Sequence, residues 1–179
     1  MQRWVPALVA GAVLAMVTAQ AEKSAEKSAG NVIDDNTINA SVKAALIGNK
    51  TTKAHDINVE TYKGAVQLSG FVDSPQQKDE ATKVASEVEG VKSVNNSISV
   101  GGKTSMGTKL DDTVTTGKVK AALMDASNVK SGQINVETNS GIVQLSGFVD
   151  SAAMKDKAGQ VAAGVSGVKK VQNALIVRN

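Results

Sequence analysis

Residues Ile57–Ser74 read INVETYKGAVQLSGFVDS, and residues Ile134–Ser151, which lie 77 positions later, read INVETNSGIVQLSGFVDS. The two stretches align without a gap, and 15 of their 18 positions are identical. Internal similarity at a fixed offset is typical of a chain that contains two copies of one structural unit. The whole organisation of the chain can therefore be worked out from this repeat.

The similarity extends beyond these two stretches at the same offset. The sequence VKAAL occurs at residues 42–46 and again at residues 119–123. We therefore expect two domains, at residues 33–100 and 110–179, each of a size that can fold around one small core.

Residues 57–72 have the pattern of a β-hairpin. Apolar and polar side chains alternate on both sides of Lys63-Gly64, which is a favourable turn pair. Val66 and Leu68 have one parity along the second strand, and Gln67 and Ser69 have the other. We expect the apolar set to face the core.

A helix is predicted on each side of this hairpin. Ile38, Val42 and Leu46 recur at helical spacing, Asp34 or Asp35 can cap that helix, and it ends near Gly48. A second helix is expected between the Ser74-Pro75-Gln76-Gln77 capping sequence and Gly90, followed by a strand at 91–100.

The predicted order in each repeat is helix, strand, strand, helix, strand. Two short helices can cover only one face of a three-stranded sheet, and a right-handed crossover makes the last strand parallel to the second. The expected fold class is α+β, with two tandem αββαβ domains. Each has a mixed three-stranded sheet with two helices on one face and the second strand in the centre.

The segments outside the repeats have different compositions. Residues 1–21 have a basic start, a short apolar run and small residues at Ala19 and Ala21, which predicts a signal peptide cleaved after Ala21. The protein is therefore expected to be exported, to the periplasm. Residues 22–32 are polar and expected to be disordered, and residues 101–109 are expected to be a glycine-rich linker.

Composition argues against most classes of active site. The chain has no cysteine and one histidine, His55, whose neighbours form no catalytic constellation. The pairs Asp34-Asp35 and Asp111-Asp112 lack the ligand spacing of a calcium loop, and we expect them to cap helices. No glycine-rich phosphate loop is present. We expect no enzyme activity, no catalytic residues, no metal, no cofactor and no small-molecule substrate.

Charge is spread unevenly between the repeats. Residues 33–100 carry 7 Lys and 9 acidic residues, a net charge of −2, whereas residues 110–179 carry 8 Lys and Arg and 6 acidic residues, a net charge of +2. This is far from the dense basic face of a nucleic-acid binder, so no nucleic-acid partner is expected. It favours contact between the second repeat and an anionic surface.

The VKAAL sequence, the run VQLSGFVDS and the Gly-Val-Lys turn, present in both copies, resemble the BON domain family. The resemblance implies a periplasmic protein linked to hyperosmotic or envelope stress. It also implies domains that bind phospholipid surfaces or assist other envelope proteins, and it supplies no catalytic residue. Glycines in both repeats are expected to be structural: Gly64, Gly70, Gly90, Gly141, Gly147 and Gly167.

Two surfaces remain as candidate binding sites. The first is a set of lysines in the second repeat that could contact anionic phospholipid: Lys118, Lys120, Lys155, Lys157, Lys169 and Lys170. The second is the sheet face away from the helices, where a chaperone-like protein could hold clients on exposed side chains: Tyr62, Phe71, Ile142 and Phe148. A bulge at Gly70 or Gly147 would instead turn the phenylalanine into the core.

Overall fold

Both predicted hairpins are present in the computed structural model, which describes residues 34–52, 54–102 and 104–178. The expected signal peptide and the expected disordered segment at 22–32 lie outside the described residues. Residues Asp34–Asn179 form one compact unit.

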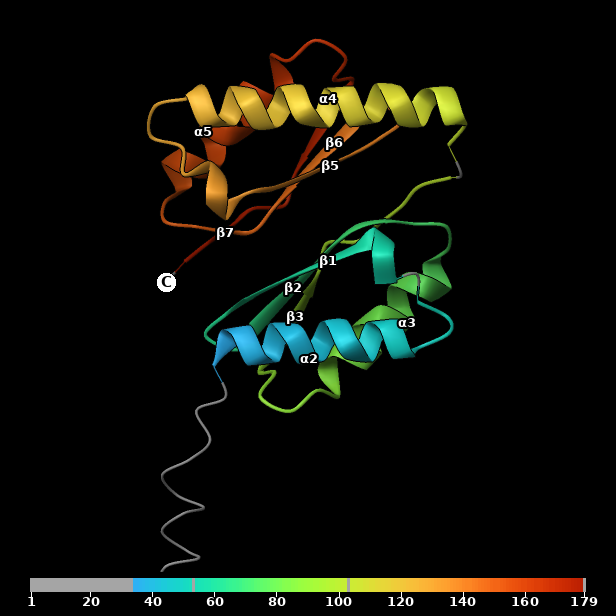
Figure 1. The fold of residues 1–179 in the computed structure, drawn as a ribbon. Helices are drawn as coiled ribbons and strands as arrows, with labels where there is room; N and C mark the ends of the chain where they lie inside the picture. The colour runs from blue at the N-terminus through green and yellow to red at the C-terminus, as the bar shows by residue number, and fades with distance from the viewer. Residues whose placement is uncertain (1–33, 53, 103, 179) are drawn as a thin grey trace, which may run out of the picture. The chain divides into compact units, whose positions relative to one another are not determined.

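The first repeat follows the predicted order of elements (Figure 1). Its elements are α2 (Asp35–Gly48), the short 3₁₀ helix η1 (Ala54–Asp56), β1 (Ile57–Tyr62), β2 (Ala65–Val72), α3 (Pro75–Ser86), β3 (Ser93–Asn96) and β4 (Ser99–Val100). Strand β2 pairs antiparallel with β1 and parallel with β3 and β4. The mixed sheet with a central second strand is confirmed.

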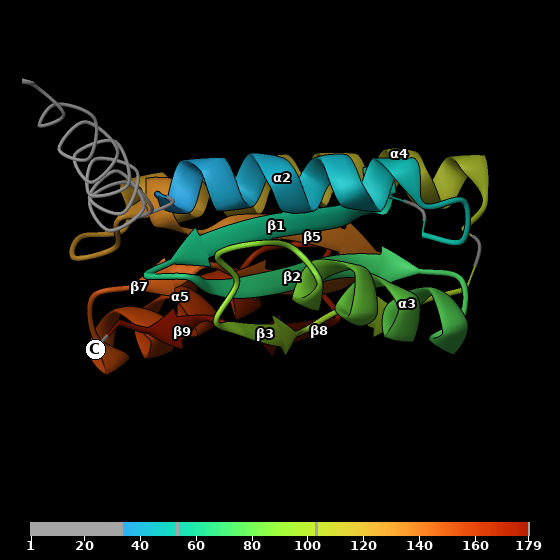
Figure 2. The same ribbon diagram turned by 90° about the horizontal axis from the view of Figure 1, so that it is seen from below.

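The second repeat has the same topology. Its elements are α4 (Met106–Asp125), the short 3₁₀ helix η2 (Ser131–Gln133), β5 (Asn135–Asn139), β6 (Ile142–Ser146), β7 (Phe148–Val149), α5 (Ala152–Ala163), β8 (Lys170–Asn173) and β9 (Ile176–Val177). Strand β6 pairs antiparallel with β5 and parallel with β8, and β7 pairs parallel with β9. In each repeat the two helices lie on one side of the strands (Figures 1 and 2).

Each repeat has its own apolar core between its helices and its sheet. In the first repeat Ile38, Val42 and Leu46 from α2 are at most 2% exposed, and Val66 and Leu68 from β2 are fully buried. In the second repeat Val119 and Leu123 from α4 and Val143 and Leu145 from β6 take the same places in the core, and the equivalent of Ile38 is the buried Thr115. Each fully buried side chain of this kind contributes about 1.5–3 kcal/mol. The predicted parity of the second strand is confirmed.

The last strand of the first repeat is not continuous, as the sequence suggested for residues 91–100, but divided into β3 and β4. At the break, the Ile98 amide donates to Asn96 Oδ1 at 2.9 Å and the Ser97 amide donates to the Leu68 carbonyl at 2.8 Å. The break turns Ile98 into the core, where it is 1% exposed. Burial of Ile98 therefore explains why β3 and β4 are separate strands.

Helix starts agree with the sequence in the first repeat, whereas the start of α4 in the second repeat differs. Asp34 caps α2, and Ser74 caps α3, as expected. The expectation that Asp111 and Asp112 cap a helix is wrong, because α4 already begins at Met106 with Ser105 as its N-cap. The connection between the repeats is correspondingly shorter than the expected 101–109. The additional helical residues extend α4 beyond the length of α2.

Candidate functional site

The side of each sheet away from its helices, here called the inner face, is polar and buried. Gln67, Ser69, Gln144 and Ser146 are each at most 2% exposed. Their hydrogen bonds join the two repeats. The hydroxyls of Ser69 and Ser146 lie 2.7 Å apart. Gln144 Oε1 accepts from the Gly70 amide at 2.6 Å, and Gln67 Oε1 accepts from the Gly147 amide at 2.8 Å. The inner faces of the two repeats therefore cover each other.

Gly70 and Gly147, whose amides donate across this contact, also approach the backbone of their own repeats closely. Their φ values are +121° and +125°, and a Cβ at either position would lie 2.1 Å from a backbone carbonyl oxygen of the same repeat, that of Asp56 or Gln133. Only glycine fits such a close approach. The four other glycines predicted to be structural also have positive φ.

The expectation that this sheet face is uncovered is therefore wrong. Phe148 is 6% exposed, and its ring lies 5.6 Å from that of Tyr62 in the other repeat. Tyr62, Phe71 and Ile142 are half-buried. The residues do lie on the predicted side of the strands, but the second repeat covers the first, which strand parity within one domain cannot reveal.

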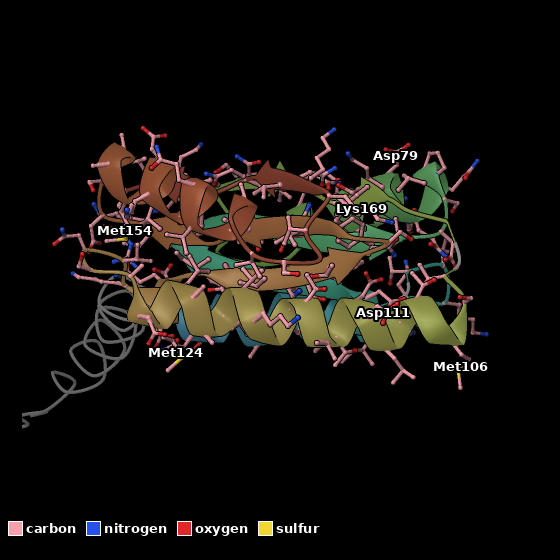
Figure 3. All side chains as sticks on the ribbon, turned by 90° about the horizontal axis from the view of Figure 1, so that it is seen from above. Asp79, Met106, Asp111, Met124, Met154 and Lys169 are labelled. Carbon is pink, nitrogen blue, oxygen red and sulfur yellow. The ribbon has the colours of Figure 1, made fainter. Side chains whose placement is uncertain are left out.

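The outer side of α4 is apolar and exposed. Met106, Leu110, Val114 and Met124 are 83%, 69%, 57% and 71% exposed, respectively. At about 100° per residue all four fall within a sector of about 80° around the helix axis. Figure 3 shows Met106 and Met124 projecting from the same side of this helix. We call these four residues the α4 outer surface; the sequence analysis did not identify it.

Lysines border this surface. Lys109 and Lys120 are exposed on α4 and lie about 60° and 40° from Met106 on one side of the surface. Lys118, also exposed, lies about 120° from Met106 on the other side, near Asp111 and Asp125. Of the predicted lipid-contact residues, only Lys118 and Lys120 belong to this helix.

The four other predicted lysines come from different elements. Lys155 and Lys157 belong to α5, Lys170 begins β8, and Lys169 precedes it. The aliphatic part of Lys169 packs over the glycine of the second hairpin turn, with its Cδ 2.9 Å from where a Cβ on Gly141 would lie. Lys169 therefore has a packing role in addition to its charge.

The second aspartate of each pair has a role that the sequence analysis missed. Asp35 accepts hydrogen bonds from the Lys63 and Gly64 amides at 2.6 and 2.8 Å. The equivalent Asp112, 7% exposed, accepts from the Ser140 and Gly141 amides at 2.7 and 2.9 Å. Each carboxylate thus fixes the hairpin turn to the first helix of its repeat.

Two other carboxylates have perturbed acidity. The backbone amide of Thr37, which donates to Asp34, lowers the pKa of Asp34 below its ordinary value of 3.8. A hydrogen bond from Lys130 at 2.6 Å lowers the pKa of Asp150, and Arg178 at 3.2 Å acts in the same direction. Both are exposed structural contacts.

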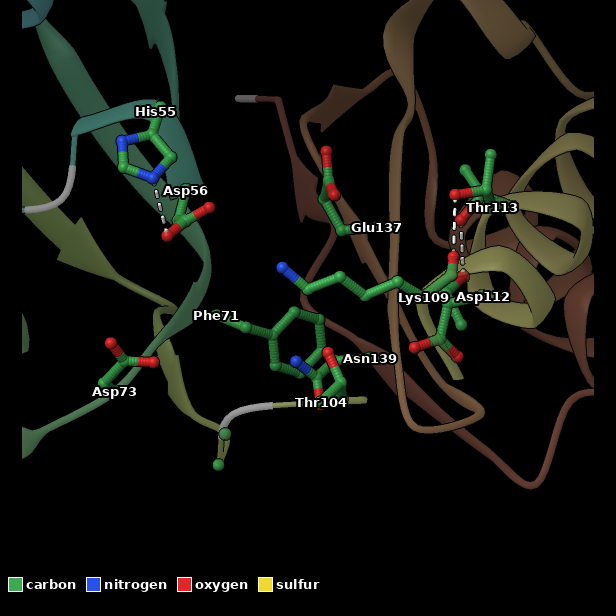
Figure 4. A pocket seen from close by; sticks show the side chains of 14 residues that line it. His55, Asp56, Phe71, Asp73, Thr104, Lys109, Asp112, Thr113, Glu137 and Asn139 are labelled. Carbon is green, nitrogen blue, oxygen red and sulfur yellow. Dashed lines mark hydrogen bonds and ion pairs between the residues drawn. The ribbon is translucent and has the colours of Figure 1, made fainter. Parts of the chain in front are cut away.

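A polar cleft of about 700 Å³ lies near the connection between the repeats (Figure 4). His55 and Asp56 form an exposed pair at 3.2 Å on its border, and Lys109 extends between Glu137 and Phe71. Within residues 34–178, leaving aside 53 and 103, no three His, Cys, Asp or Glu side chains are grouped to hold a metal ion. The cleft has no arrangement that we recognise as catalytic.

No helix in the described part of the chain is long and apolar enough to cross a membrane. The α4 outer surface is the feature of the described residues that most resembles a binding surface. It combines exposed apolar side chains with adjacent positive charge on one rigid element.

Comparison with known proteins gives consistent similarities over most of the chain. The chain is 46% identical to osmotically-inducible protein Y of Escherichia coli over 154 residues, which is 85% of this chain and 77% of that protein. It is 33% identical to the outer membrane lipoprotein DolP of Haemophilus influenzae, over 96% of this chain and 86% of that one. It is also 34% identical to a 21 kDa hemolysin of Actinobacillus pleuropneumoniae, over 81% of this chain and 75% of that one.

Among solved structures, CdsD, a structural protein of the type III secretion system of Chlamydia trachomatis, matches with a TM-score of 0.35 and 15% identity, over 90% of this chain and 75% of that one. The BON domain matches twice, at residues 34–102 and 111–179. These two matches coincide with the two repeats and with the two sheets that pack through their inner faces. The chain belongs to the BON domain family, with two BON domains in tandem.

Proposed function

We propose that this protein is a non-catalytic protein of the bacterial envelope that binds anionic phospholipid surfaces through the α4 outer surface. The observation that carries the proposal is the exposure of Met106, Leu110, Val114 and Met124 on one side of a single helix. A helix that exposes an apolar sector bordered by lysines can lie at the boundary between headgroups and acyl chains.

The relatives support the envelope as the place of action. One relative is named for osmotic induction, and another is named as an outer membrane lipoprotein. From this similarity we infer that this protein is located in the periplasm and acts under hyperosmotic stress. The apolar start of the sequence, with small residues at Ala19 and Ala21, agrees with export.

The apolar residues supply the larger part of the binding free energy in this proposal. Burial of an exposed Leu, Val or Met side chain contributes about 1–2 kcal/mol, and a lysine near an anionic surface contributes about 1 kcal/mol. Four apolar residues with Lys120 give a total of several kcal/mol, from which the cost of association is subtracted. The expected binding is peripheral and reversible.

The remaining predicted lysines act at longer range. Lys118, Lys155, Lys157, Lys169 and Lys170 contribute to the net charge of +2 of the second repeat. This charge would attract the repeat to an anionic surface and orient it before α4 makes contact. Direct contact is assigned to Lys120, because the side chain of Lys109 extends into the polar cleft between Glu137 and Phe71.

The alternative function, client holding on the open sheet face, requires the two inner faces to separate. Gln67, Ser69, Gln144 and Ser146 are buried against each other in this structure, and Phe148 is covered. The α4 outer surface needs no such rearrangement before it can bind. Lipid binding is therefore the function that the geometry supports best.

Vesicle cosedimentation tests the proposal. The variant Leu110→Ser/Val114→Ser should lose about tenfold or more in affinity for vesicles of phosphatidylglycerol and phosphatidylcholine, since about 2–4 kcal/mol of apolar burial is removed. The matched control is Ile47→Ser, which removes a 74% exposed side chain from α2 and should leave binding unchanged. Equal binding by both variants would contradict the proposal.

A further inference from the structure

The contact between the two inner faces has the symmetry of a dimer interface. Most hydrogen bonds across it occur twice, made once by each of two equivalent residues 77 positions apart. Gly70 donates to Gln144 and Gly147 donates to Gln67, while Gln144 Nε2 donates to the Ser97 carbonyl and Gln67 Nε2 donates to the Ala174 carbonyl, both at 2.7 Å. The pair Ser69 and Ser146 lies on the pseudo-two-fold axis.

The rim of the interface repeats the same relation. Asn58 donates to Glu137 at 3.1 Å, and its equivalent Asn135 donates to Glu60 at 2.6 Å. An interface in which the same patch is used on both sides is isologous, as in two-fold homodimers. Here both patches belong to one chain.

We propose that a second copy of this chain can occupy the same interface, so that the first repeat of one molecule docks on the second repeat of another in a reciprocal dimer. Every hydrogen bond of the closed monomer is available between chains, because the contacts do not depend on the connection between the repeats. The only covalent link between β4, which ends at Val100, and α4, which begins at Met106, is a segment of five residues.

The polar character of the inner faces makes the exchange accessible. When the repeats separate, water can form hydrogen bonds with the side chains of Gln67, Ser69, Gln144 and Ser146. An apolar interface would instead expose a hydrophobic patch to water. Each repeat retains its own core between helices and sheet. Separation of the repeats therefore does not require either to unfold.

Pairing of unlike repeats is favoured over pairing of like repeats. The net charges of the two repeats are −2 and +2, so unlike repeats attract and like repeats repel. Arg178 of the second repeat lies 5.0 Å from the Tyr62 ring of the first, and Ser99 donates to Gln172 at 2.7 Å. The first contact has no equivalent between two copies of one repeat, because Gly101 and Asn139 take the places of Arg178 and Tyr62. The second contact is lost between two copies of the second repeat, because Ile176 takes the place of Ser99.

Mass action sets when the dimer forms. Within one chain a short connection gives an effective concentration in the millimolar range. The closed monomer should therefore predominate at micromolar concentration, and the reciprocal dimer should appear as the concentration approaches about 1 mM. The same interface serves both states.

Cysteine pairs test the proposal, because the chain has no cysteine of its own. The double variant Ser69→Cys/Ser146→Cys, oxidised when dilute, should form a disulfide within one chain, since the two hydroxyls lie 2.7 Å apart. A concentrated mixture of the Ser69→Cys chain with the Ser146→Cys chain should form a disulfide between chains that joins residues 69 and 146. Peptide mapping identifies the linked residues.

The control mixture combines Ser93→Cys with Ser127→Cys, both at exposed positions on different repeats, and measures linkage by random collision. At least a fivefold excess of the 69–146 linkage over this control is expected. An equal yield would overturn the proposal, as would preferential linkage of 69 to 69 or 146 to 146. Failure of the double variant to form its internal disulfide would overturn the interface itself.

A measurement on the wild-type protein tests the proposal without relying on the cysteine variants being correctly folded. Sedimentation equilibrium should show a dimer fraction that grows as concentration rises from about 10 μM to about 1 mM, following the effective concentration of the connection. A chain that stays monomeric throughout and also gives no linkage above the control would refute the exchange.

Discussion

Replacing Gln144 with alanine should lower the free energy of unfolding, because it removes hydrogen bonds between the two inner faces. The side chain is 2% exposed and bonds only to the other repeat through its amide: Oε1 accepts from the Gly70 amide at 2.6 Å, and Nε2 donates to the Ser97 carbonyl at 2.7 Å. Gln144→Ala therefore leaves two backbone groups of the first repeat without these partners.

The expected loss follows from these two groups. A buried donor left unsatisfied costs about 1–3 kcal/mol, and the Gly70 amide is in the buried part of the contact. The Ser97 carbonyl lies in a half-buried contact and should contribute about 1 kcal/mol. The free energy of unfolding should fall by about 2–4 kcal/mol, a large part of the 5–15 kcal/mol typical of a native protein.

Urea unfolding followed by circular dichroism measures this change. With a denaturant dependence of about 1–3 kcal/mol per molar, the midpoint should fall by about 1–2 M. Gln160→Ala is the matched control, because Gln160 is exposed on α5 and its substitution should change stability by less than about 0.5 kcal/mol. Equal midpoints for both variants would refute the claim that the inner-face hydrogen bonds stabilise the fold.

Three further outcomes are expected. Gly70→Ala and Gly147→Ala should each destabilise the protein by more than about 3 kcal/mol in the same urea assay, because each Cβ would lie 2.1 Å from a carbonyl oxygen, whereas Gly132→Ala, with open space around its Cβ, should be tolerated; a small effect at both inner positions would contradict the close approach. Lys130→Gln should raise the pKa of Asp150 toward its ordinary value of 3.8 in an NMR titration. Because the folded pKa is lowered, the contribution of this pair is present above the unfolded pKa and lost as pH falls through the folded pKa, and an unchanged titration would show that Lys130 is not the main cause. Vesicle binding should weaken, without disappearing, as salt shortens the screening length from about 10 Å at 0.1 M to about 3 Å at 1 M, since the α4 outer surface contributes an apolar part; complete loss would mean that the lysines act alone.

The fold of each repeat could be predicted from local patterns because its signals are local. Ile38, Val42 and Leu46 mark the buried side of α2, and the Lys63-Gly64 pair marks the turn, as the structure confirms. The helix start at Ser74 was equally readable, because capping depends on residues within one turn. These features need no knowledge of the rest of the chain.

The parts that could not be predicted depend on contacts between distant residues. Buried Gln67 and Gln144 look like ordinary solvent-facing positions in an alternating strand, and only the docking of the second repeat explains their burial. Their identity in both repeats was the available signal, since solvent-facing residues need not be the same. Asp35 and Asp112 were also retained in both copies, and both fix a hairpin turn.

The α4 outer surface was missed for a different reason. The glycines and small polar residues at 101–109 predict a linker, which places Met106 outside any helix and leaves Leu110 ahead of the expected cap at Asp111. Ser105 is a favourable N-cap residue and indicates a helix start at Met106, in place of a linker that continues to residue 109. Once α4 is extended to Met106, its exposed apolar residues align on one side.

The most direct test of lipid binding through α4 is whether this surface enters the membrane. In a chain without native cysteine, Leu110→Cys can be labelled with an environment-sensitive fluorophore, and Ile47→Cys on α2 provides the matched control. Addition of anionic vesicles should shift the emission of the label at position 110 to the blue and leave that at position 47 unchanged. Equal spectra at the two positions, with vesicles bound, would contradict the assignment of α4 as the membrane-binding surface.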